Sequence, residues 1–196
     1  MSMKKFTEDK KSTFLYWLCH WLCFQYVAIK LHVWMPWYIF HDIEKPLLMW
    51  MWKDYPKVRN WHRKHHRHHM EYDNGTIAPW LYCDYTGMVV DWECSHYSKA
   101  SEPLNAYETF CYEVEKAFKE KNPLVIHQLY NYYFEVLQNL KLVPDDFYTS
   151  DLYKKLQDKE WTKWDGREFY LKRYGRPAPT KLLKDGTPYV KQLKKK

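Results

Sequence analysis

The chain has 196 residues, of which 46% are hydrophobic and 19% aromatic, and this supply of core-forming side chains excludes a chain that is disordered throughout. Only 5 glycines occur, and neither a GxGxxG nor a GxxxxGK[ST] pattern is present, which argues against a β-rich fold with many tight turns and against two glycine-loop modes of nucleotide binding. The net charge of +7 is uneven, because residues 151–196 hold 14 Lys or Arg and 6 Asp or Glu, whereas residues 1–150 hold 17 and 18.

The N-terminal part predicts two helices. Ser12 or Thr13 can cap a first helix that runs to about His32, and residues 37–52 predict a second helix after a bend at Pro36, with an interruption at Pro46 left open.

The apolar run at 14–40 is interrupted by polar residues, so its uninterrupted part is too short for a membrane span. Acidic residues at 8 and 9 do not suit a signal peptide. The run is interpreted as a buried core helix, and no membrane partner is expected.

The middle of the chain predicts further helices separated by loops. Residues 54–56 are expected to form a loop and residues 58–70 a helix, followed by a turn at 73–76. Three more helices are expected. Thr86 can cap a helix that carries residues 89–97, and Ser101 with Pro103 can start a helix that runs to about residue 121. Asn122-Pro123 can start a helix that runs to about residue 142.

After about residue 150 the pattern becomes basic and mostly irregular, with aromatic residues spread among charges. Aromatics in such a segment can stack on nucleic-acid bases, but anchoring the segment to its own core is the favoured interpretation; the residues concerned are Trp161, Trp164, Phe169 and Tyr170. The sequence therefore predicts an all-α protein, with a compact helical domain over 12–145 and a basic C-terminal extension over 146–196.

The five cysteines are odd in number and lack CxxC spacing. Cys19 and Cys23 fall on one helical face, a pattern more typical of core packing than of metal binding. This usage favours a reducing, cytoplasmic setting.

Histidines are concentrated in the predicted helix 58–70. His62, His65, His66 and His69 fall at i, i+3, i+4 and i+7, which is one helical face, whereas His68 points elsewhere. Imidazole is a common metal ligand, although basic neighbours in this segment also fit a solvated helix.

Polar ligand types in other apolar segments favour the metal-binding interpretation. His41 and Asp42 follow an aromatic run, Asp91 follows Met88-Val89-Val90, and His20 lies between Trp17 and Phe24. A buried carboxylate is costly unless something neutralises it, and a divalent cation does so.

The order His, His-Asp, His, His, Asp across these helices resembles the HD superfamily of metal-dependent phosphohydrolases. The chain is also similar, over roughly residues 14–142, to an uncharacterised bacterial and phage family, the domain of unknown function numbered 5662. The matching residues are His20, Pro36-Trp37, His41-Asp42-Ile43-Glu44-Lys45, His62, His68-His69-Met70-Glu71-Tyr72 and Val89-Val90-Asp91-Trp92.

The resemblance implies an HD-like helical bundle that holds one or two divalent ions, with Mn, Fe, Co, Ni or Zn as the candidates. A first ion would be held by His20, His41, Asp42 and Asp91, and a second by His62 and His69 with Asp42 as a bridge. His65 and His66 stand where the family pattern has other residues, so the choice of ligands among the clustered histidines stays open.

The same resemblance implies hydrolysis of a nucleotide or a related small phosphate ester by metal-activated water. Lys45 would meet the phosphate and Glu44 would assist proton transfer, although both residue types also fit a solvated surface. Two alternatives remain: a di-iron oxygenase of the HD type, and a non-enzymatic metal-stabilised module that binds nucleic acid or an acidic partner through residues 151–196.

Overall fold

The computed structural model describes residues 14–66, 69, 82–98 and 104–164, and the remaining residues lie outside the description. Within the described ranges every regular element is a helix, so the predicted all-α class is confirmed. None of the described helices has the length and hydropathy of a membrane span.

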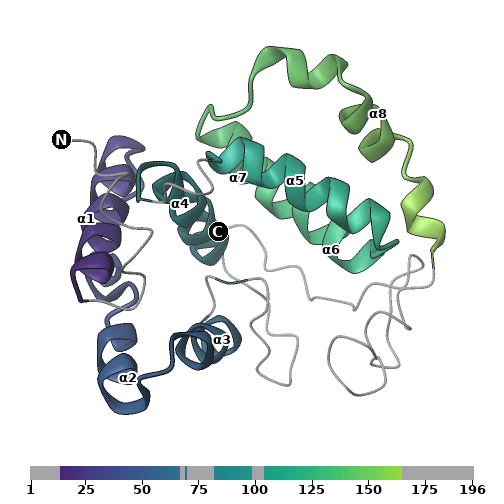
Figure 1. Cartoon of the computed structure of the whole chain (residues 1–196). Coiled ribbons are helices and arrows are strands. Elements are labelled where there is room, and N and C mark those ends of the chain that lie inside the picture. Colours follow the sequence, from purple (N-terminus) through teal and green to yellow (C-terminus); the bar gives the residue numbers. More distant parts are fainter. Residues whose placement is uncertain (1–13, 67–68, 70–81, 99–103, 165–196) are drawn as a thin grey trace. The chain divides into compact units, whose positions relative to one another are not determined.

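The chain divides into two compact units (Figure 1). The first comprises residues 1–74 and 83–106, and the second comprises residues 75–82 and 107–196. The domain predicted over 12–145 therefore includes helices from both units.

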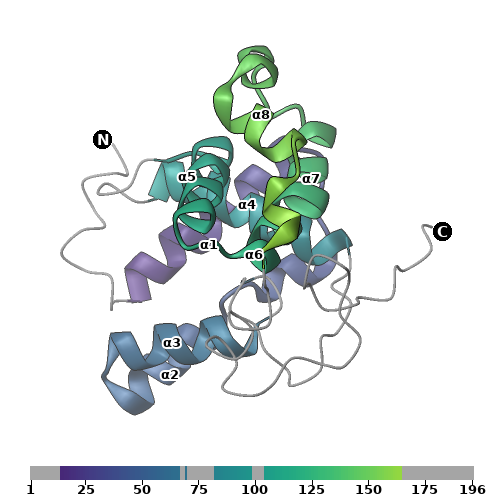
Figure 2. The ribbon, with the colours of Figure 1, turned by 90° about the vertical axis from the view of Figure 1, so that its right-hand side faces the viewer.

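The described residues of the first unit form four α-helices and one 3-10 helix. They are α1 (Phe14–Lys30), η3 (Pro36–Phe40), α2 (Glu44–Trp52), α3 (Tyr55–His65) and α4 (Tyr82–Ser98). Helices α2 and α3 pack side by side, as both views show (Figure 1 and Figure 2).

The core of this unit lies between one face of α1 and one face of α4. Phe24 and Val27 from α1 and Val90 and Cys94 from α4 belong to one cluster of buried residues. The prediction of a buried core helix holds for this face of α1, but Leu22 on the other face is exposed. A helix that is apolar on both faces needs a cover on both.

The predicted helix 37–52 is wrong in its middle. The chain forms η3, turns at residues 41–43 and then begins α2 at Glu44. The break lies at Asp42, whose φ of 59° is in the left-handed region that no right-handed helix contains. Pro46 does not interrupt α2, because it lies in the first turn, where no backbone N–H is required.

The predicted helix 58–70 begins earlier and ends earlier than expected. Asp54 caps α3 by accepting a hydrogen bond from the Lys57 N–H, so the expected loop at 54–56 is the start of a helix. The helix ends at His65, and His66 has extended dihedral angles. His66 and His69 are therefore not on the helical face that the spacing predicted.

Helix α4 is longer than predicted, because Thr86 is not its cap. Thr86 is buried within α4, which begins at Tyr82.

Three α-helices come first along the chain in the described part of the second unit. They are α5 (Ala106–Lys119), α6 (Pro123–Gln128) and α7 (Phe134–Asn139), with a π-helical turn, η4 (Leu129–Tyr133), between α6 and α7. The predicted start at Asn122-Pro123 is confirmed, because the Asn122 side chain accepts a hydrogen bond from the Val125 N–H and Pro123 opens the helix.

The unit continues with short helices where the sequence predicted irregular structure. They are η5 (Asp145–Thr149), α8 (Asp151–Gln157) and η6 (Glu160–Lys163). Trp161 is buried and Trp164 packs edge-on against Phe118, so these two aromatics anchor the segment to its own unit, as predicted. Phe169 and Tyr170 lie outside the described residues.

Candidate metal centre

The buried face of α1 positions His20. Its Nε2 lies 3.0 Å from Asp91 Oδ1 of α4 and 3.5 Å from Asp42 Oδ2 in the turn before α2. Residues separated by 71 positions in the chain thus meet at one imidazole edge, as the sequence analysis expected.

His41 brings a second imidazole to the same point. Its ring stacks on Phe24 with 3.7 Å between centroids, and its Nε2 lies 3.5 Å from Asp42 Oδ2 and 3.7 Å from Asp91 Oδ1. His20, His41 and Asp91 form a group whose ligand atoms all lie within 4.8 Å of one another, which is the spacing of a site that could hold a metal ion.

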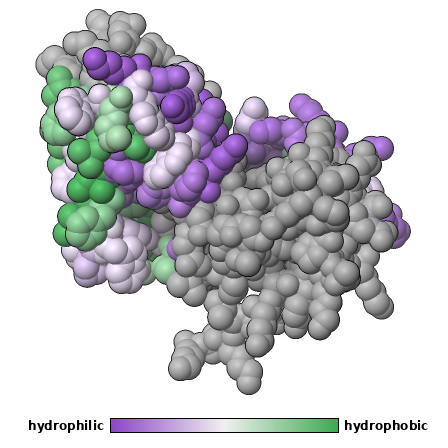
Figure 3. Space-filling view, turned by 90° about the horizontal axis from the view of Figure 1, so that it is seen from below, coloured by the Kyte–Doolittle hydropathy of each residue, from purple (hydrophilic) through white to green (hydrophobic). Residues whose placement is uncertain are grey.

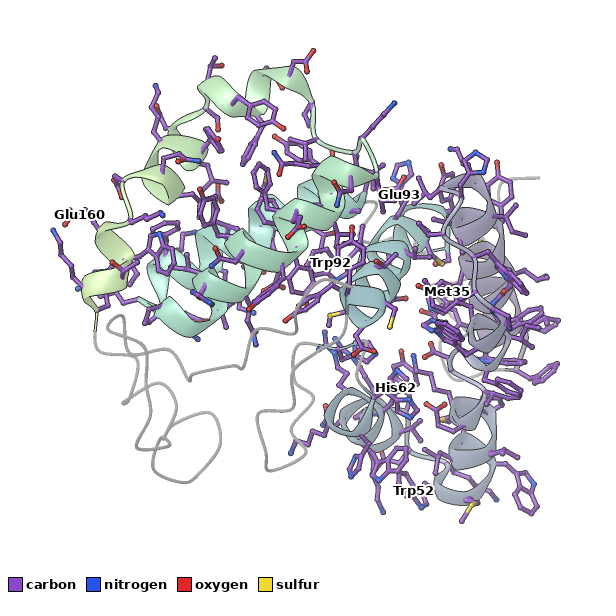
Figure 4. All side chains as sticks on the ribbon, turned by 180° about the vertical axis from the view of Figure 1, so that it is seen from behind. Met35, Trp52, His62, Trp92, Glu93 and Glu160 are labelled. Atoms are coloured by element: carbon purple, nitrogen blue, oxygen red, sulfur yellow. The ribbon has the colours of Figure 1, made fainter. Side chains whose placement is uncertain are left out.

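A second group forms on the other side of Asp42. His62 Nε2 lies 3.0 Å from Asp42 Oδ1 and 2.6 Å from His69 Nε2. Figure 4 shows His62 projecting from α3 into the interior of the unit. Asp42, His62 and His69 could also hold a metal ion. The two oxygens of Asp42 therefore face different groups of histidines.

Glu44 and His66 contact the same histidine from outside. Glu44 Oε1 hydrogen-bonds with His62 Nδ1 and lies 3.3 Å from His66 Nε2, and these three residues form a third group with metal-ligand spacing. His65 lies apart from these three groups, because its ring stacks on Trp61. His68 lies outside the described residues.

Lys45 contributes the nearest lysine charge. Its Nζ forms an ion pair with Asp42 Oδ2, and its side chain is 26% exposed, whereas that of Asp42 is 1% exposed. The lysine that the sequence analysis placed at the phosphate thus contacts the buried carboxylate of Asp42 while its own side chain is partly exposed.

The centre holds its carboxylates in the charged form. Burial alone raises the pKa of Asp42, but the charges of His41 and Lys45 outweigh it and hold that pKa well below its usual range. Burial likewise raises the pKa of Asp91, and the hydrogen bonds from His20 and His41 reverse this effect. Two buried anions at this spacing call for cations.

The pKa values of two histidines in the centre are shifted in the opposite direction from those of the aspartates. Burial alone lowers the pKa of His20, but hydrogen bonds to Asp42 and Asp91 raise it to about 9. The pKa of His62 is also raised, because the hydrogen bonds to Asp42 and Glu44 outweigh its burial. The raised pKa values favour protons on the nitrogens that a divalent cation would use, so metal binding would compete with these protons.

Contacts behind His20 fix its orientation, and the sequence analysis missed them. His20 Nδ1 lies 3.3 Å from Ser98 Oγ, and Ser98 donates its hydroxyl proton to the Cys94 carbonyl. The Ser98 oxygen is therefore an acceptor for His20 Nδ1–H, which leaves Nε2 facing the carboxylates. The signal was available, because Asp91, Cys94 and Ser98 fall at i, i+3 and i+7 on one helical face.

The residues present fit a divalent cation by the chemistry of their donor atoms. In the first two groups, imidazole nitrogens and carboxylate oxygens converge from separate elements and are largely buried. His62 and His69 bring two Nε2 atoms within 2.6 Å of each other, and a cation can use the lone pairs of both.

A pocket of about 300 Å³ adjoins the centre within the first unit. His41 and His66 line one part of it, Trp37 and Phe40 supply aromatic surface, and Asp84 supplies a carboxylate. The pocket can therefore receive a molecule that has both a flat apolar part and polar groups.

Comparisons with protein-family models, with curated proteins and with solved structures found no match for this chain.

Proposed function

We propose that this protein is a metal-dependent phosphohydrolase that acts on a nucleotide or a related small phosphate ester. The observation that carries the proposal is that the two oxygens of the Asp42 carboxylate face different groups of histidines. Oδ2 faces His20 and His41, whereas Oδ1 faces His62. A carboxylate that faces two groups of nitrogen ligands is suited to bridge two divalent ions.

The first ion would be held by His20, His41, Asp42 and Asp91, and the second by Asp42, His62 and His69. When bound, such ions lower the pKa of water toward neutrality and stabilise the oxygens that attack and leave a phosphorus centre. The resemblance to the HD superfamily supports this ligand assignment, because the residues brought together are those in its motif.

Lys45 would bind the phosphate as a point charge. The charge of Asp42 raises the pKa of Lys45 in spite of its burial, so the ammonium form is stable at neutral pH. Because its side chain is partly exposed, the same ammonium group can contact a bound anion. The adjoining pocket would hold the organic part of the ester against Trp37 and Phe40.

The proposal is tested by measuring metal content and phosphate release. Protein purified without added metal is analysed by mass spectrometry, and phosphate release from a panel of nucleotides is then measured with Mn²⁺, Co²⁺, Ni²⁺ or Zn²⁺. We expect Lys45→Ala to retain metal but to lose at least about tenfold in kcat/KM, because a charge-assisted contact contributes 1.5–3 kcal/mol. The matched control is Lys57→Ala, which removes an exposed lysine of α3.

Two results would replace this function with another. Iron in the purified protein together with oxygen consumption would favour a di-iron oxygenase, which the same arrangement of Asp42 accommodates. Absence of metal even after reconstitution would remove the enzymatic proposal. Salt-dependent binding through residues 151–196 would then be the function to test.

A further inference from the structure

Large apolar side chains are exposed on one part of the first unit. Of the 16 exposed large hydrophobic residues in the described part of the chain, 13 lie between residues 14 and 51. Figure 3 shows hydrophobic residues gathered along one edge of the described surface. We call these 13 exposed residues the apolar face: Phe14, Leu15, Leu22, Tyr26, Ile29, Trp34, Trp37, Ile39, Phe40, Ile43, Leu47, Trp50 and Met51.

The apolar face is continuous from α1 to η3, because side chains of α1 hydrogen-bond with η3 and with Trp34, which precedes it. Trp21 donates to the Ile39 carbonyl at 2.8 Å, and Gln25 donates to the Tyr38 carbonyl at 2.7 Å. Trp34 in turn donates to Gln25 Oε1. These contacts fix the exposed aromatic groups against α1.

The exposed side of α1 has the pattern of a helix that packs on another helix. Leu15, Leu22 and Ile29 are spaced by seven residues and are all exposed, and Tyr26 lies one turn after Leu22. A seven-residue apolar repeat forms a continuous seam along a helix. The opposite face of α1 already lies in the core, so this seam is not used within the described part of the unit.

The size of the apolar face matches a specific protein interface. Its six aromatic residues are between 41% and 79% exposed, and at roughly 150–250 Å² per aromatic side chain they alone leave about 600 Å² outside. Together with the aliphatic members these side chains expose roughly 1,000 Å² in total. A standard interface needs about 800 Å² per partner.

The small number of charged residues on α1 and η3 favours a second copy of the chain as the partner. The only Lys, Arg, Asp or Glu in helix α1 is Lys30, which donates to the Tyr97 hydroxyl, and η3 contains none of these residue types. Two copies of the apolar face can therefore meet without opposing like charges. A lipid-binding helix would carry more basic residues beside its apolar side than α1 does.

We propose that the apolar face is a homodimer interface, in which the α1 seam and η3 of one copy pack against those of a second copy. The interface is isologous, because each copy contributes the same surface. The α1 seam contains neither a ligand of the metal centre nor a residue that lines the pocket, so variants in the seam test this proposal separately from the catalytic one. Trp37 and Phe40 belong both to the apolar face and to the pocket lining.

Sedimentation velocity of the full chain over the micromolar range tests the interface. We expect the wild-type chain to sediment as a dimer, and Leu22→Glu and Ile29→Glu to weaken dimerisation by more than about tenfold, because each places like charges opposite one another. Tyr112→Glu is the matched control, because Tyr112 has a similar exposed fraction but lies on α5. Circular dichroism and metal content establish that each variant is folded.

A wild-type chain that stays monomeric at every concentration overturns the proposal, whether or not the variants fold. Co-flotation of that monomer with anionic vesicles would assign the face to a lipid surface instead. Dimers that persist in both Glu variants would place the interface elsewhere and also overturn the proposal.

Discussion

Asp42 has the most constrained position in the centre. Its residue is 1% exposed, its φ is 59°, and its carboxylate contacts histidines from two directions as well as Lys45. A left-handed conformation costs most L-residues about 1–2 kcal/mol, although Asp and Asn adopt it more readily than others. The turn at Asp42 aims one carboxylate at both groups of histidines, which a continuous helix through this residue would not do.

The first prediction compares the two aspartates by isosteric substitution. We expect Asp42→Asn to lose both ions, because its two oxygens face both groups, and Asp91→Asn to lose only the ion near His20. Asn suits both backbones, since it tolerates the left-handed region and preserves side-chain shape. Metal content per chain by mass spectrometry measures the difference.

Asp84→Asn is the control for this pair, because Asp84 also lies on α4 but belongs to none of the three groups. Equal loss of metal in the Asp42 and Asp91 variants would contradict the bridging assignment.

The second prediction concerns Glu44, which the sequence analysis placed in proton transfer. Its Oε1 contacts His62 Nδ1, which suits a positioning residue that holds the other nitrogen toward Asp42 and His69. Removal of such a partner typically weakens metal binding by about 10–100-fold. We expect that loss for Glu44→Ala and partial recovery for Glu44→Gln, which retains an acceptor oxygen.

Competition with a chromophoric chelator measures these affinities, and Glu108→Ala on α5 is the control. Unchanged affinity in Glu44→Ala would show that the contact does not orient His62. Unchanged metal affinity with a lost rate of phosphate release would instead return Glu44 to a proton-transfer role.

At the scale of elements, local caps define where several helices begin. The Asn122 side chain accepts a hydrogen bond from the Val125 N–H at the start of α6. The Asp54 side chain accepts one from the Lys57 N–H at the start of α3. Both caps precede a proline, which has no backbone N–H that would need a hydrogen-bond acceptor. Such signals act within four residues, so they can be read without knowledge of the fold, as at Asn122. The cap at Asp54 was nevertheless missed, because the pattern at residues 54–56 predicted a loop.

The third prediction tests the cap of α6. Asn122 is 7% exposed and its side chain satisfies a backbone donor, so we expect Asn122→Ala to lower the free energy of unfolding by about 0.5–2 kcal/mol. Asn122→Asp should recover most of this loss, because Asp is an equally good cap. Urea unfolding followed by circular dichroism provides the measurement, and an Ala variant as stable as the wild type would contradict the role of the cap.

At the scale of the whole molecule, the centre lies within one of the two units. All of its residues belong to 1–74 and 83–106, whereas residues 107–164 supply a separate core that includes Phe110, Phe134 and Trp161. Metal binding to the folded state should therefore stabilise the first unit directly.

The fourth prediction follows from this division. Metal at 100 times its dissociation constant adds about 2.7 kcal/mol to the stability of the state that binds it. We expect removal of metal by a chelator to accelerate hydrogen exchange in α1 and α4 and to leave α5 and α7 nearly unchanged. Exchange measured by mass spectrometry distinguishes the units, and equal acceleration in both would contradict a centre confined to the first.

The sequence by itself determined the all-α class, the cap of α6 and the residue types gathered at the centre. Helix-forming patterns and caps depend on neighbouring residues, and buried His and Asp in apolar segments indicate a cation because their isolated burial is costly. His20, His41, Asp42 and Asp91 were singled out on this basis, whereas His62 and His69 were added by the resemblance to the HD superfamily, with the choice among the clustered histidines left open. The structure brings all six together.

Only the tertiary structure decided how these residues are arranged. Periodicity predicted a helix through His41-Asp42 and another through His69, but the chain turns at both places because contacts across the unit outweigh local preference. The partners behind the ligands, Ser98 for His20 and Glu44 for His62, depend on distances between elements. The exposure of one side of α1 was likewise not predicted, because hydrophobicity alone does not distinguish a buried face from an exposed apolar face.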